Sequence, residues 1–366
     1  MKTYFVTGGA GFIGSNFVLY MLRMHSDIRI VNVDALTYAG NRENLRSVED
    51  DPRHIFIQAD IRDAALMADL VQRYNPDYVV NFAAESHVDR SIADPGAFVD
   101  TNVLGTVSLL NAVRQLWEHE DGTWCADKRY LQVSTDEVYG SLPLDDPQAF
   151  FYEDTPLNPH SPYSASKASA DHFVMAYHDT YGMPTVITRC SNNYGPFQFP
   201  EKLIPLMIGN SLAHKKLPVY GDGLNVRDWL FVEDHCKAID LVLQKGRLGQ
   251  VYNVGGHNER SNISIVKKVI EECAFATGDT AITEELISYV EDRKGHDRRY
   301  GIAPDKIREE IGWEPETAFE NGIVRTIRWY LTHHDWLDHV LSGSYRDYQP
   351  SADMKADRYT TERESD

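Results

Sequence analysis

Three glycines at a spacing of three residues follow the first apolar segment and constrain the fold more than any other feature. Residues 3–7 read TYFVT, and Gly8, Gly11 and Gly14 stand between this run and a helical stretch. Glycine permits a tight bend, lets the backbone approach a ligand, and leaves the N–H groups of the next helix facing an anion. A strand, a glycine turn and a helix in this order predict a dinucleotide-binding unit.

Short apolar runs alternate with helical patterns through the first two thirds of the chain. The runs are rich in Val, Ile, Tyr and Phe and do not alternate strictly with polar residues, which is typical of parallel strands buried on both faces. Helical stretches, such as 102–117 and 163–181, fall between them. The chain is therefore predicted to have an α/β fold, a Rossmann-type doubly wound parallel sheet. The expected strands are 3–7, 28–33, 54–59, 78–83, 129–134 and 185–190.

The pattern becomes less regular after residue 190, where glycine-rich turns separate short elements. We expect an NAD-binding Rossmann domain over residues 1–190. A smaller mixed α/β lobe for the substrate is expected mainly over 191–348, with the chain crossing between the lobes. Residues 349–366 are polar and aperiodic, which predicts a mobile tail.

Charge and composition exclude several classes of protein. A net charge of −19 repels nucleic acid and anionic membranes. No apolar run approaches the ~20 residues of a membrane helix, and the first residues lack a signal-peptide pattern. We expect a cytoplasmic protein without nucleic-acid or membrane partners. Four scattered cysteines without a C-x-x-C pair argue against a disulfide framework or a thiolate zinc site, so we expect no metal.

An acidic residue downstream of the glycine turn specifies the cofactor. Asp34 ends the second apolar run, 20 residues after Gly14. A carboxylate there accepts hydrogen bonds from the adenosine ribose and repels a 2′-phosphate, so it predicts NAD rather than NADP. Asp60 ends the third run and either contacts the adenine edge or caps the following helix.

Tyr163 and Lys167 stand four residues apart in a helical stretch, so both side chains lie on one face. An ammonium beside a phenol lowers the phenol pKa, which would let Tyr163 act as a base near neutral pH. The same spacing also occurs by chance in exposed helix pairs. Its position in a chain that begins with a nucleotide turn favours a catalytic pair.

Two adjacent acids, Asp136 and Glu137, follow Thr135 at the end of a buried run. Carboxyls in different surroundings can have separated pKa values, so that one serves as acid and the other as base. A solvated loop pair is the alternative, and these residues alone do not decide between the two.

Several motifs together carry a family resemblance. The glycine turn, the Y-x-x-x-K pair and the N-x-x-G-T segment at 102–106 resemble the extended short-chain dehydrogenase/reductase family. Within it, the chain resembles the dTDP-glucose 4,6-dehydratases over residues 1–348. The motifs that carry this closer resemblance are AESHVDRS at 84–91, STDEVYG at 134–140, SPYSASK at 161–167, RCSNNYGP at 189–196 and GHDRRY at 295–300.

The resemblance implies a role for each catalytic residue. Tyr163 would take the proton of the sugar C4 hydroxyl while hydride passes to NAD, and Lys167 would tune Tyr163 and bind the nicotinamide ribose. Thr135 would hydrogen-bond the reacting hydroxyl. Glu137 would remove the C5 proton and Asp136 would protonate the departing C6 hydroxyl, after which hydride returns to C6.

The resemblance also assigns binding residues. The cofactor set is Gly8, Gly11, Phe12, Ile13, Gly14, Asp34, Leu36, Thr37, Asp60, Ile61, Phe82, Ala83, Ala84, Ser86, Thr101, Tyr163, Lys167 and Asn193. The substrate set is Ser86, His87, Thr135, Asn192, Lys202, Leu203, Pro218, Tyr220, Arg227, Asn262, Arg293 and His296. Within the second set, the basic residues are expected on the diphosphate. Lys294 stands where the family usually has Pro, which predicts a looser loop.

Other functions remain open at this point. One is a sugar-nucleotide 4,6-dehydratase for another base, and another is a 4-epimerase or decarboxylase on the same scaffold. The Asp136–Glu137 pair disfavours an epimerase, because inversion at C4 needs no acid or base at C6 and C5. A nucleotide-sensing protein would have lost Tyr163 or Lys167. The resemblance further implies a homodimer formed through helices near 102–117 and 163–181, and dTDP-glucose as substrate.

Overall fold

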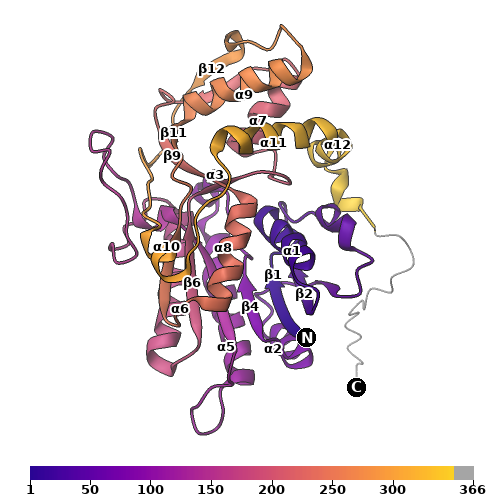
Figure 1. Ribbon diagram of the computed structural model, residues 1–366, viewed down its shortest axis with the longest axis vertical. Helices are drawn as coiled ribbons and strands as arrows, with labels where there is room; N and C mark the ends of the chain where they lie inside the picture. The colour runs from indigo at the N-terminus through magenta and orange to yellow at the C-terminus, as the bar shows by residue number, and fades with distance from the viewer. Residues whose placement is uncertain (350–366) are drawn as a thin grey trace.

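A seven-stranded parallel sheet forms the centre of the computed structural model, which describes residues 1–349 (Figure 1). The strand order is β10-β6-β5-β4-β1-β2-β3, the doubly wound arrangement, so the predicted fold class is confirmed. The six expected strands are all present. The bounds are β1 (Lys2–Thr7), β2 (Ile28–Asp34), β3 (His54–Gln58), β4 (Tyr78–Asn81), β5 (Arg129–Thr135), β6 (Thr185–Cys190) and β10 (Gln250–Val254).

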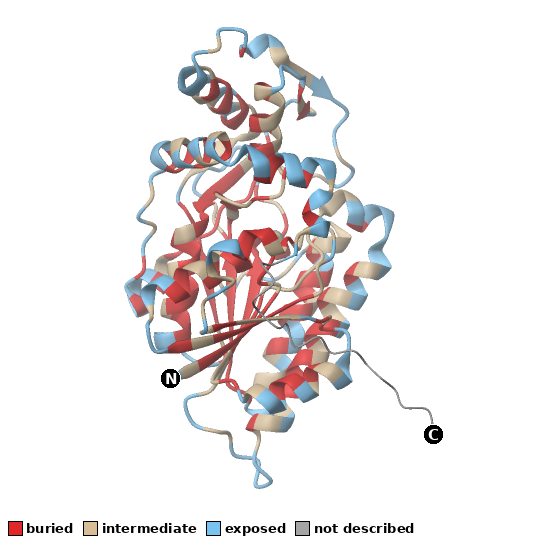
Figure 2. Ribbon diagram, turned by 90° about the vertical axis from the view of Figure 1, so that its right-hand side faces the viewer, coloured by how far each residue is buried: buried red, intermediate tan, exposed pale blue. Residues whose placement is uncertain are grey.

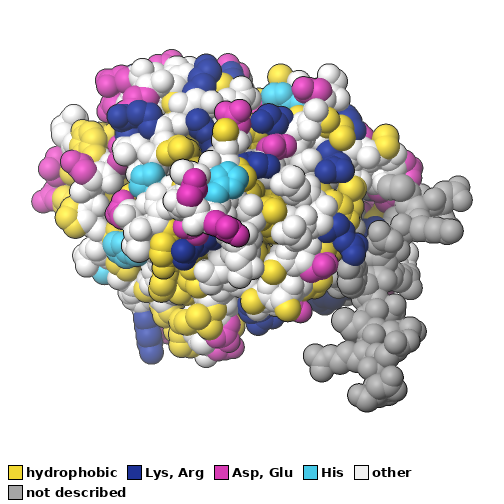
Figure 3. All heavy atoms as spheres, turned by 90° about the horizontal axis from the view of Figure 1, so that it is seen from below, with side chains coloured by type: hydrophobic (Ala, Val, Ile, Leu, Met, Phe, Trp, Pro, Cys, Tyr) yellow, Lys and Arg dark blue, Asp and Glu magenta, His cyan; other side chains and the backbone are white. Residues whose placement is uncertain are grey.

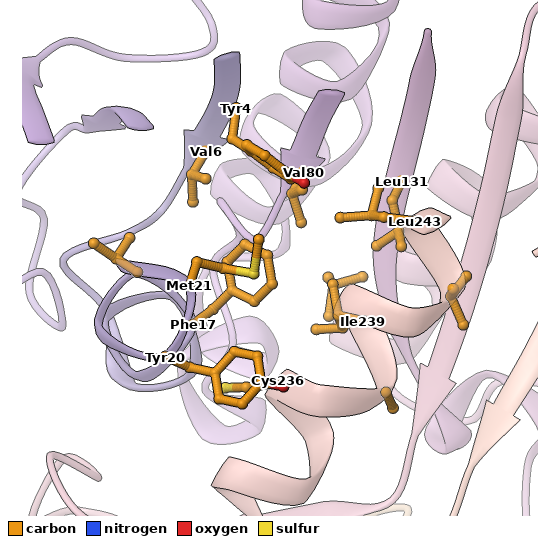
Figure 4. Close-up of a cluster of buried hydrophobic side chains, with 14 of the residues drawn as sticks. Tyr4, Val6, Phe17, Tyr20, Met21, Val80, Leu131, Cys236, Ile239 and Leu243 are labelled. Atoms are coloured by element: carbon orange, nitrogen blue, oxygen red, sulfur yellow. The ribbon is translucent and has the colours of Figure 1, made fainter. Parts of the chain in front are cut away.

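Helices cover both faces of this sheet because successive side chains of a strand point to opposite sides. Tyr4 and Val6 of β1 pack in one cluster with α1 (Phe12–Met24) and α8 (Val232–Lys245), as Figure 4 shows. Phe5, between them, packs in a second cluster on the other face. That face is covered by α2 (Ala64–Tyr74), α5 (Thr106–Trp117) and α6 (Pro162–Tyr181). Figure 2 shows the strands as buried between helices whose outer sides are exposed.

The helix expected over 102–117 begins regularly only at Thr106. Residues Val99–Gly105 form a π-helix instead. The buried Asn102 explains this difference, because its amide is committed elsewhere: Oδ1 accepts from the Glu85 N–H at 2.8 Å, and Nδ2 donates to the Glu85 carbonyl and to Ser166 Oγ. π-Helical turns often mark functional sites, and this one borders the cavity described below.

A second core lies beyond the carboxyl ends of the strands. Its elements are two small sheets, β11-β9-β7 and β12-β8, and helices from the C-terminal half of the chain. The strand β10 lies in the main sheet beside β6, so the chain returns to the first layer after residue 190. The bounds are β7 (Asn192–Tyr194), β8 (Leu217–Tyr220), β9 (Val226–Phe231), β11 (Glu259–Ser261), β12 (Ile287–Val290), α7 (Leu203–Leu212), α9 (Asn262–Thr277), α11 (Phe319–Thr332) and α12 (His334–Ser342).

The remaining elements are short. They are α3 (Val88–Ala93), α4 (Pro95–Phe98), α10 (Asp305–Ile311) and the 3₁₀ helices η1 (Arg42–Val48), η3 (Asp136–Tyr139), η4 (Glu284–Leu286) and η5 (Ser344–Asp347). No helix in the described part of the chain is long and apolar enough to cross a membrane. Figure 3 shows acidic and basic side chains interspersed on the face seen from below. The tail predicted at 349–366 falls, from residue 350 on, outside the described residues.

Candidate active site

The glycine turn after β1 forms a cradle that larger residues would fill. Gly8 has φ +71°, and a Cβ on it would stand 2.6 Å from the Ala83 nitrogen. A Cβ on Gly14 would stand 2.2 Å from the Gly8 carbonyl oxygen. The helix α1 begins at Phe12, its N-cap residue Gly11 offers no side-chain cap, and its first turn has no acidic residue. Its first N–H groups are therefore suited to an anion such as a dinucleotide diphosphate.

Asp34 fixes this turn to the end of β2. Its carboxylate accepts hydrogen bonds from the backbone N–H groups of Ala10, at 2.9 Å, and Leu36, at 2.8 Å. Burial raises the pKa of Asp34, while these backbone hydrogen bonds lower it. Asp60 accepts from the backbone and guanidinium of Arg62, and the cap of α2 is Asp63 instead.

A cavity of about 350 Å³ extends from the glycine turn to the ends of β5 and β6. Every residue predicted to bind the cofactor lines it except Leu36. That side chain packs against the hydrophobic core behind Asp34, and its backbone adopts a positive φ of 52°. The predicted residues in the lining are Gly8, Gly11, Phe12, Ile13, Gly14, Asp34, Thr37, Asp60, Ile61, Phe82, Ala83, Ala84, Ser86, Thr101, Tyr163, Lys167 and Asn193.

The same cavity is lined by the residues at the end of β5, Thr135, Asp136 and Glu137. Thr135 closes the strand and caps η3: its Oγ1 accepts from the Glu137 N–H at 3.3 Å and donates to Asp136 Oδ1 at 3.3 Å. Asp136 is 1% exposed, and its Oδ2 has no hydrogen-bond partner among the described residues. Glu137 Oε2 accepts from Ser164 Oγ at 3.1 Å. The turn thus directs both acids into one cavity.

The two acids differ in the charges that surround them. Burial raises the pKa of Asp136 well above its usual range, and the carboxylates of Glu137 and Asp228 raise it further. Burial also raises the pKa of Glu137, but the positive charges of Arg227 and Lys202 and the Ser164 hydrogen bond oppose that rise. Asp136 therefore favours the protonated form more strongly than Glu137 does.

The helix α6 brings Tyr163 and Lys167 to this cavity. Its N-terminus is capped by Ser161, whose Oγ accepts from the Ser164 N–H at 3.0 Å. Lys167 is buried, and its Nζ donates to the Val133 carbonyl at 2.8 Å. Burial lowers the pKa of this ammonium.

The expected lowering of the Tyr163 pKa is not found, and the prediction is wrong in direction. Burial raises the pKa of Tyr163 well above its usual value. The nearby groups of Glu137, Cys190 and Asp136 add to the rise, and a hydrogen bond with Thr135 opposes it. Four-residue spacing places both side chains on one face of α6, but burial of the phenol is the largest influence on its pKa, and the carboxyls at the end of β5 add to it.

A second cavity, of about 250 Å³, lies beside the first and is walled by the second lobe. Every residue predicted to bind the substrate lines it except Thr135, which lines the first. The two cavities share Glu137 and Lys202, so they meet beside the acid pair. The predicted residues in its lining are Ser86, His87, Asn192, Lys202, Leu203, Pro218, Tyr220, Arg227, Asn262, Arg293 and His296.

Basic side chains in the second cavity are held by backbone, acidic and aromatic partners. Arg227 is buried, donates to the Asp297 carbonyl at 2.9 Å and lies over the Tyr300 ring. Arg293 lies over the Tyr220 ring and pairs with Asp89. Lys202 Nζ donates to the Ser86 carbonyl at 3.1 Å. His296 Nδ1 donates to Asp292 Oδ1 at 2.6 Å, and burial lowers the pKa of His296. Four acids, Asp89, Glu137, Glu201 and Asp297, stand in the same lining, so the basic groups supply individual charged donors to an anionic ligand rather than a net positive charge.

Known proteins match this chain over nearly its whole length. A family model described as GDP-mannose 4,6 dehydratase matches residues 5–326. The dTDP-glucose 4,6-dehydratase of Xanthomonas campestris pv. campestris (strain B100) is 56% identical over 351 residues, covering 94% of this chain and 98% of the relative. The chain belongs to the dTDP-glucose 4,6-dehydratase family.

Solved structures of this dehydratase family share the fold. The dTDP-glucose 4,6-dehydratase of Bacillus anthracis in complex with NAD is 48% identical, with a TM-score of 0.82, and the match covers 93% of this chain and all of that one. The dTDP-glucose 4,6-dehydratase DesIV of Streptomyces venezuelae, with NAD and TYD bound, is 45% identical, with a TM-score of 0.84. That match covers 92% and 99% of the two chains.

Further residues of this dehydratase family member line the cavities without having been predicted from the sequence. Tyr38 follows the predicted Thr37, and Glu201 precedes the predicted Lys202, so both stood next to assigned positions. Gln198 and Glu201 line both cavities, and Tyr300 lines the second. Tyr300 stands in the GHDRRY motif at 295–300, but no local pattern marks Gln198 or Glu201, which reach the site through the packing of distant segments. The missed residues include Tyr38, Arg62, Glu85, Cys190, Ser191, Gln198, Phe199, Glu201, Trp229, Asp297 and Tyr300.

Proposed function

We propose that the protein converts dTDP-glucose to dTDP-4-keto-6-deoxyglucose with NAD as its cofactor. The observation that carries this proposal is the position of Glu137 where the two cavities meet, with Asp136 and Tyr163 beside it in the first. A sugar attached to a nucleotide in the second cavity reaches all three groups from there. The names of the relatives support the choice of reaction.

The first cavity fits NAD. The glycine cradle and the uncapped start of α1 would hold the diphosphate, and Asp34 would accept from the adenosine ribose and repel a 2′-phosphate. When bound, NAD accepts a hydride from the sugar and later returns it. The DesIV structure contains NAD, which supports this choice.

Oxidation at C4 needs a group to take the hydroxyl proton. Tyr163 is that group in our proposal, with Thr135 hydrogen-bonded to the same hydroxyl and Lys167 on the nicotinamide ribose. The raised pKa of Tyr163 means that the phenol favours its protonated form in these surroundings. The positive charge of an oxidised nicotinamide would oppose this rise.

Loss of water across C5 and C6 needs one base and one acid. Glu137 would take the C5 proton, and Asp136 would give its proton to the C6 hydroxyl, which leaves as water. The different surroundings of the two carboxyls support these opposite tasks. Hydride return to C6 and a proton at C5 then complete the 4-keto-6-deoxy sugar.

The second cavity is proposed for the nucleotide and its diphosphate, with Lys202, Arg227, Arg293 and His296 on the phosphates. The relatives are named for dTDP-glucose, whereas the family model is described by a GDP sugar. The test is incubation with dTDP-glucose, UDP-glucose or GDP-mannose, followed by mass spectrometry. Loss of one water from dTDP-glucose at the lowest concentration supports the proposal. Preference for another nucleotide would refute the dTDP assignment, and no loss of water from any would refute the reaction.

We also propose that the protein works in the cytoplasm as a homodimer. The π-helix Val99–Gly105 and α6 lie side by side and carry exposed apolar side chains, including Leu104 and Phe173. Burying such side chains against a second copy would stabilise a pair. Sedimentation of the wild type as a dimer and of Phe173→Asp as a monomer is the expected outcome. A monomeric wild type would contradict it.

A further inference from the structure

The C-terminal part of the described chain lies against the loop that borders the first cavity. The strap, as we call it, is residues 334–348, and the cofactor loop is residues 35–49. In Figure 1 the yellow end of the chain lies beside the indigo segment between β2 and β3. Side chains of the strap form hydrogen bonds to the cofactor loop across 292 to 307 positions of sequence.

Asn44 connects the strap to the glycine turn. Its Oδ1 accepts from the indole Nε1 of Trp336 at 2.8 Å, and its Nδ2 donates to the carbonyl of Ala10 at 3.0 Å. All three residues are buried, so water cannot replace a lost partner without entering the core. Trp336 therefore fixes the side-chain amide of Asn44. That amide in turn holds Ala10, which lies between Gly8 and Gly11 in the glycine turn.

Tyr345 makes a second connection at the rim of the cavity. Its hydroxyl donates to the Tyr38 carbonyl, and its ring packs edge-on against Phe199. Phe199 in turn packs edge-on against the Tyr38 ring. Tyr38 and Phe199 both line the first cavity, so the strap supports its wall from outside.

We propose that Trp336, Asn44 and Tyr345 are positioning residues that retain the cofactor between the two hydride transfers. This inference rests on the proposed function, because the hydride taken from C4 must return to C6 from the same cofactor. If the cofactor left after the first transfer, the oxidised sugar would remain in the site without the hydride that must return to C6. The hydrogen bonds of Trp336 and Tyr345 hold the glycine turn and the cavity rim at Tyr38 in place. They would slow the release of the cofactor without contacting the sugar.

The test measures how fast labelled NAD leaves the protein when excess unlabelled NAD is added. Trp336→Phe removes one N–H and keeps an aromatic ring, and we expect release to accelerate roughly tenfold. Tyr345→Phe removes only a hydroxyl and should act in the same direction. Trp117→Phe is the matched control, because it also removes one buried indole N–H, which donates to the Pro76 carbonyl at 3.2 Å, and Trp117 lines neither cavity.

The outcomes separate this inference from the proposed function. Faster release in Trp336→Phe and Tyr345→Phe, with Trp117→Phe like the wild type, supports the strap. Equal losses of Tm in all three variants with unchanged release would show a purely structural role and overturn it. If Trp336→Phe does not fold, a Tyr345→Phe variant that releases NAD at the wild-type rate would overturn the proposal. A wild type that binds no NAD would refute the proposed function as well.

Discussion

At the scale of single residues, the opposite tasks of Asp136 and Glu137 follow from their neighbours rather than from their own chemistry. Asp136 is enclosed beside two other carboxyls with Arg227 opposing them, whereas Glu137 has both Arg227 and Lys202 against the single carboxyl of Asp297. A carboxyl in the first kind of surroundings holds its proton, and one in the second releases it more readily. The pair at the end of β5 can therefore give one proton and take another.

The raised pKa of Asp136 makes a prediction about stability and pH. The folded protein keeps this proton where the unfolded chain has lost it, so the folded state binds more protons and stability falls as pH rises through this range. Asp136→Asn carries no such proton. We expect the free energy of unfolding of Asp136→Asn, minus that of the wild type, to increase from pH 5 to pH 8 in denaturant titrations. A difference that stays constant with pH would contradict the raised pKa.

Glu137→Gln should separate oxidation from elimination. The amide keeps the shape of the side chain but cannot take the C5 proton. We expect NADH absorbance to appear with dTDP-glucose, while exchange of the C5 hydrogen with deuterated water falls by about 10²–10⁴-fold. Glu153→Gln, at a partly buried carboxyl outside both cavities, is the control and should exchange normally. Full exchange in Glu137→Gln would assign the base to another group.

Tyr163→Phe should block the first hydride transfer. The hydroxyl is the proposed proton acceptor, so the rate of NADH formation in a stopped-flow experiment should fall by about 10²–10⁴-fold while substrate binding persists. Tyr177→Phe on the same helix removes a hydroxyl that bonds Asn111 instead, and should form NADH normally. A normal NADH burst from Tyr163→Phe would remove Tyr163 from the mechanism.

At the scale of elements, the first strand, turn and helix decide where the cofactor lies. The Gly14→Ala variant tests this because the new Cβ would meet the Gly8 carbonyl oxygen. We expect a loss of about 1–3 kcal/mol in stability and weakened NAD binding by calorimetry. Gly209→Ala in α7 is the matched control, since its Cβ meets no atom within 4 Å. NAD affinity of Gly14→Ala equal to that of the wild type would place the cofactor elsewhere.

Apolar runs predict the elements of the first lobe because they reflect burial on both faces of a sheet. Six strands of the main sheet were predicted correctly from these apolar runs. The π-helix at 99–105 is not, because it depends on the contacts of Asn102 with Glu85 and Ser166, which lie 17 and 64 positions away. The raised pKa of Tyr163 likewise depends on its burial in the assembled fold, with a further contribution from carboxyls of a different element.

At the scale of the whole molecule, the sequence shows which residue types the site needs but not how the lobes meet. Motifs identify the predicted lining of both cavities, with Leu36 as the exception among the cofactor residues. Residues such as Gln198 and Glu201 can be recognised as lining residues only from the structure, in which the second lobe packs on the first. The same holds for the strap, which lies nearly 300 positions from the loop that it supports.

The path of one hydride tests the central claim most directly. The protein is given dTDP-glucose carrying deuterium at C4, with NAD, and the product is examined by mass spectrometry and NMR. We predict a sugar that has lost one water, carries a ketone at C4 and holds the deuterium at C6. A product of unchanged mass with inverted C4 would instead make the protein an epimerase. Loss of the deuterium from the sugar would show that the hydride does not return, and would contradict the dehydratase mechanism.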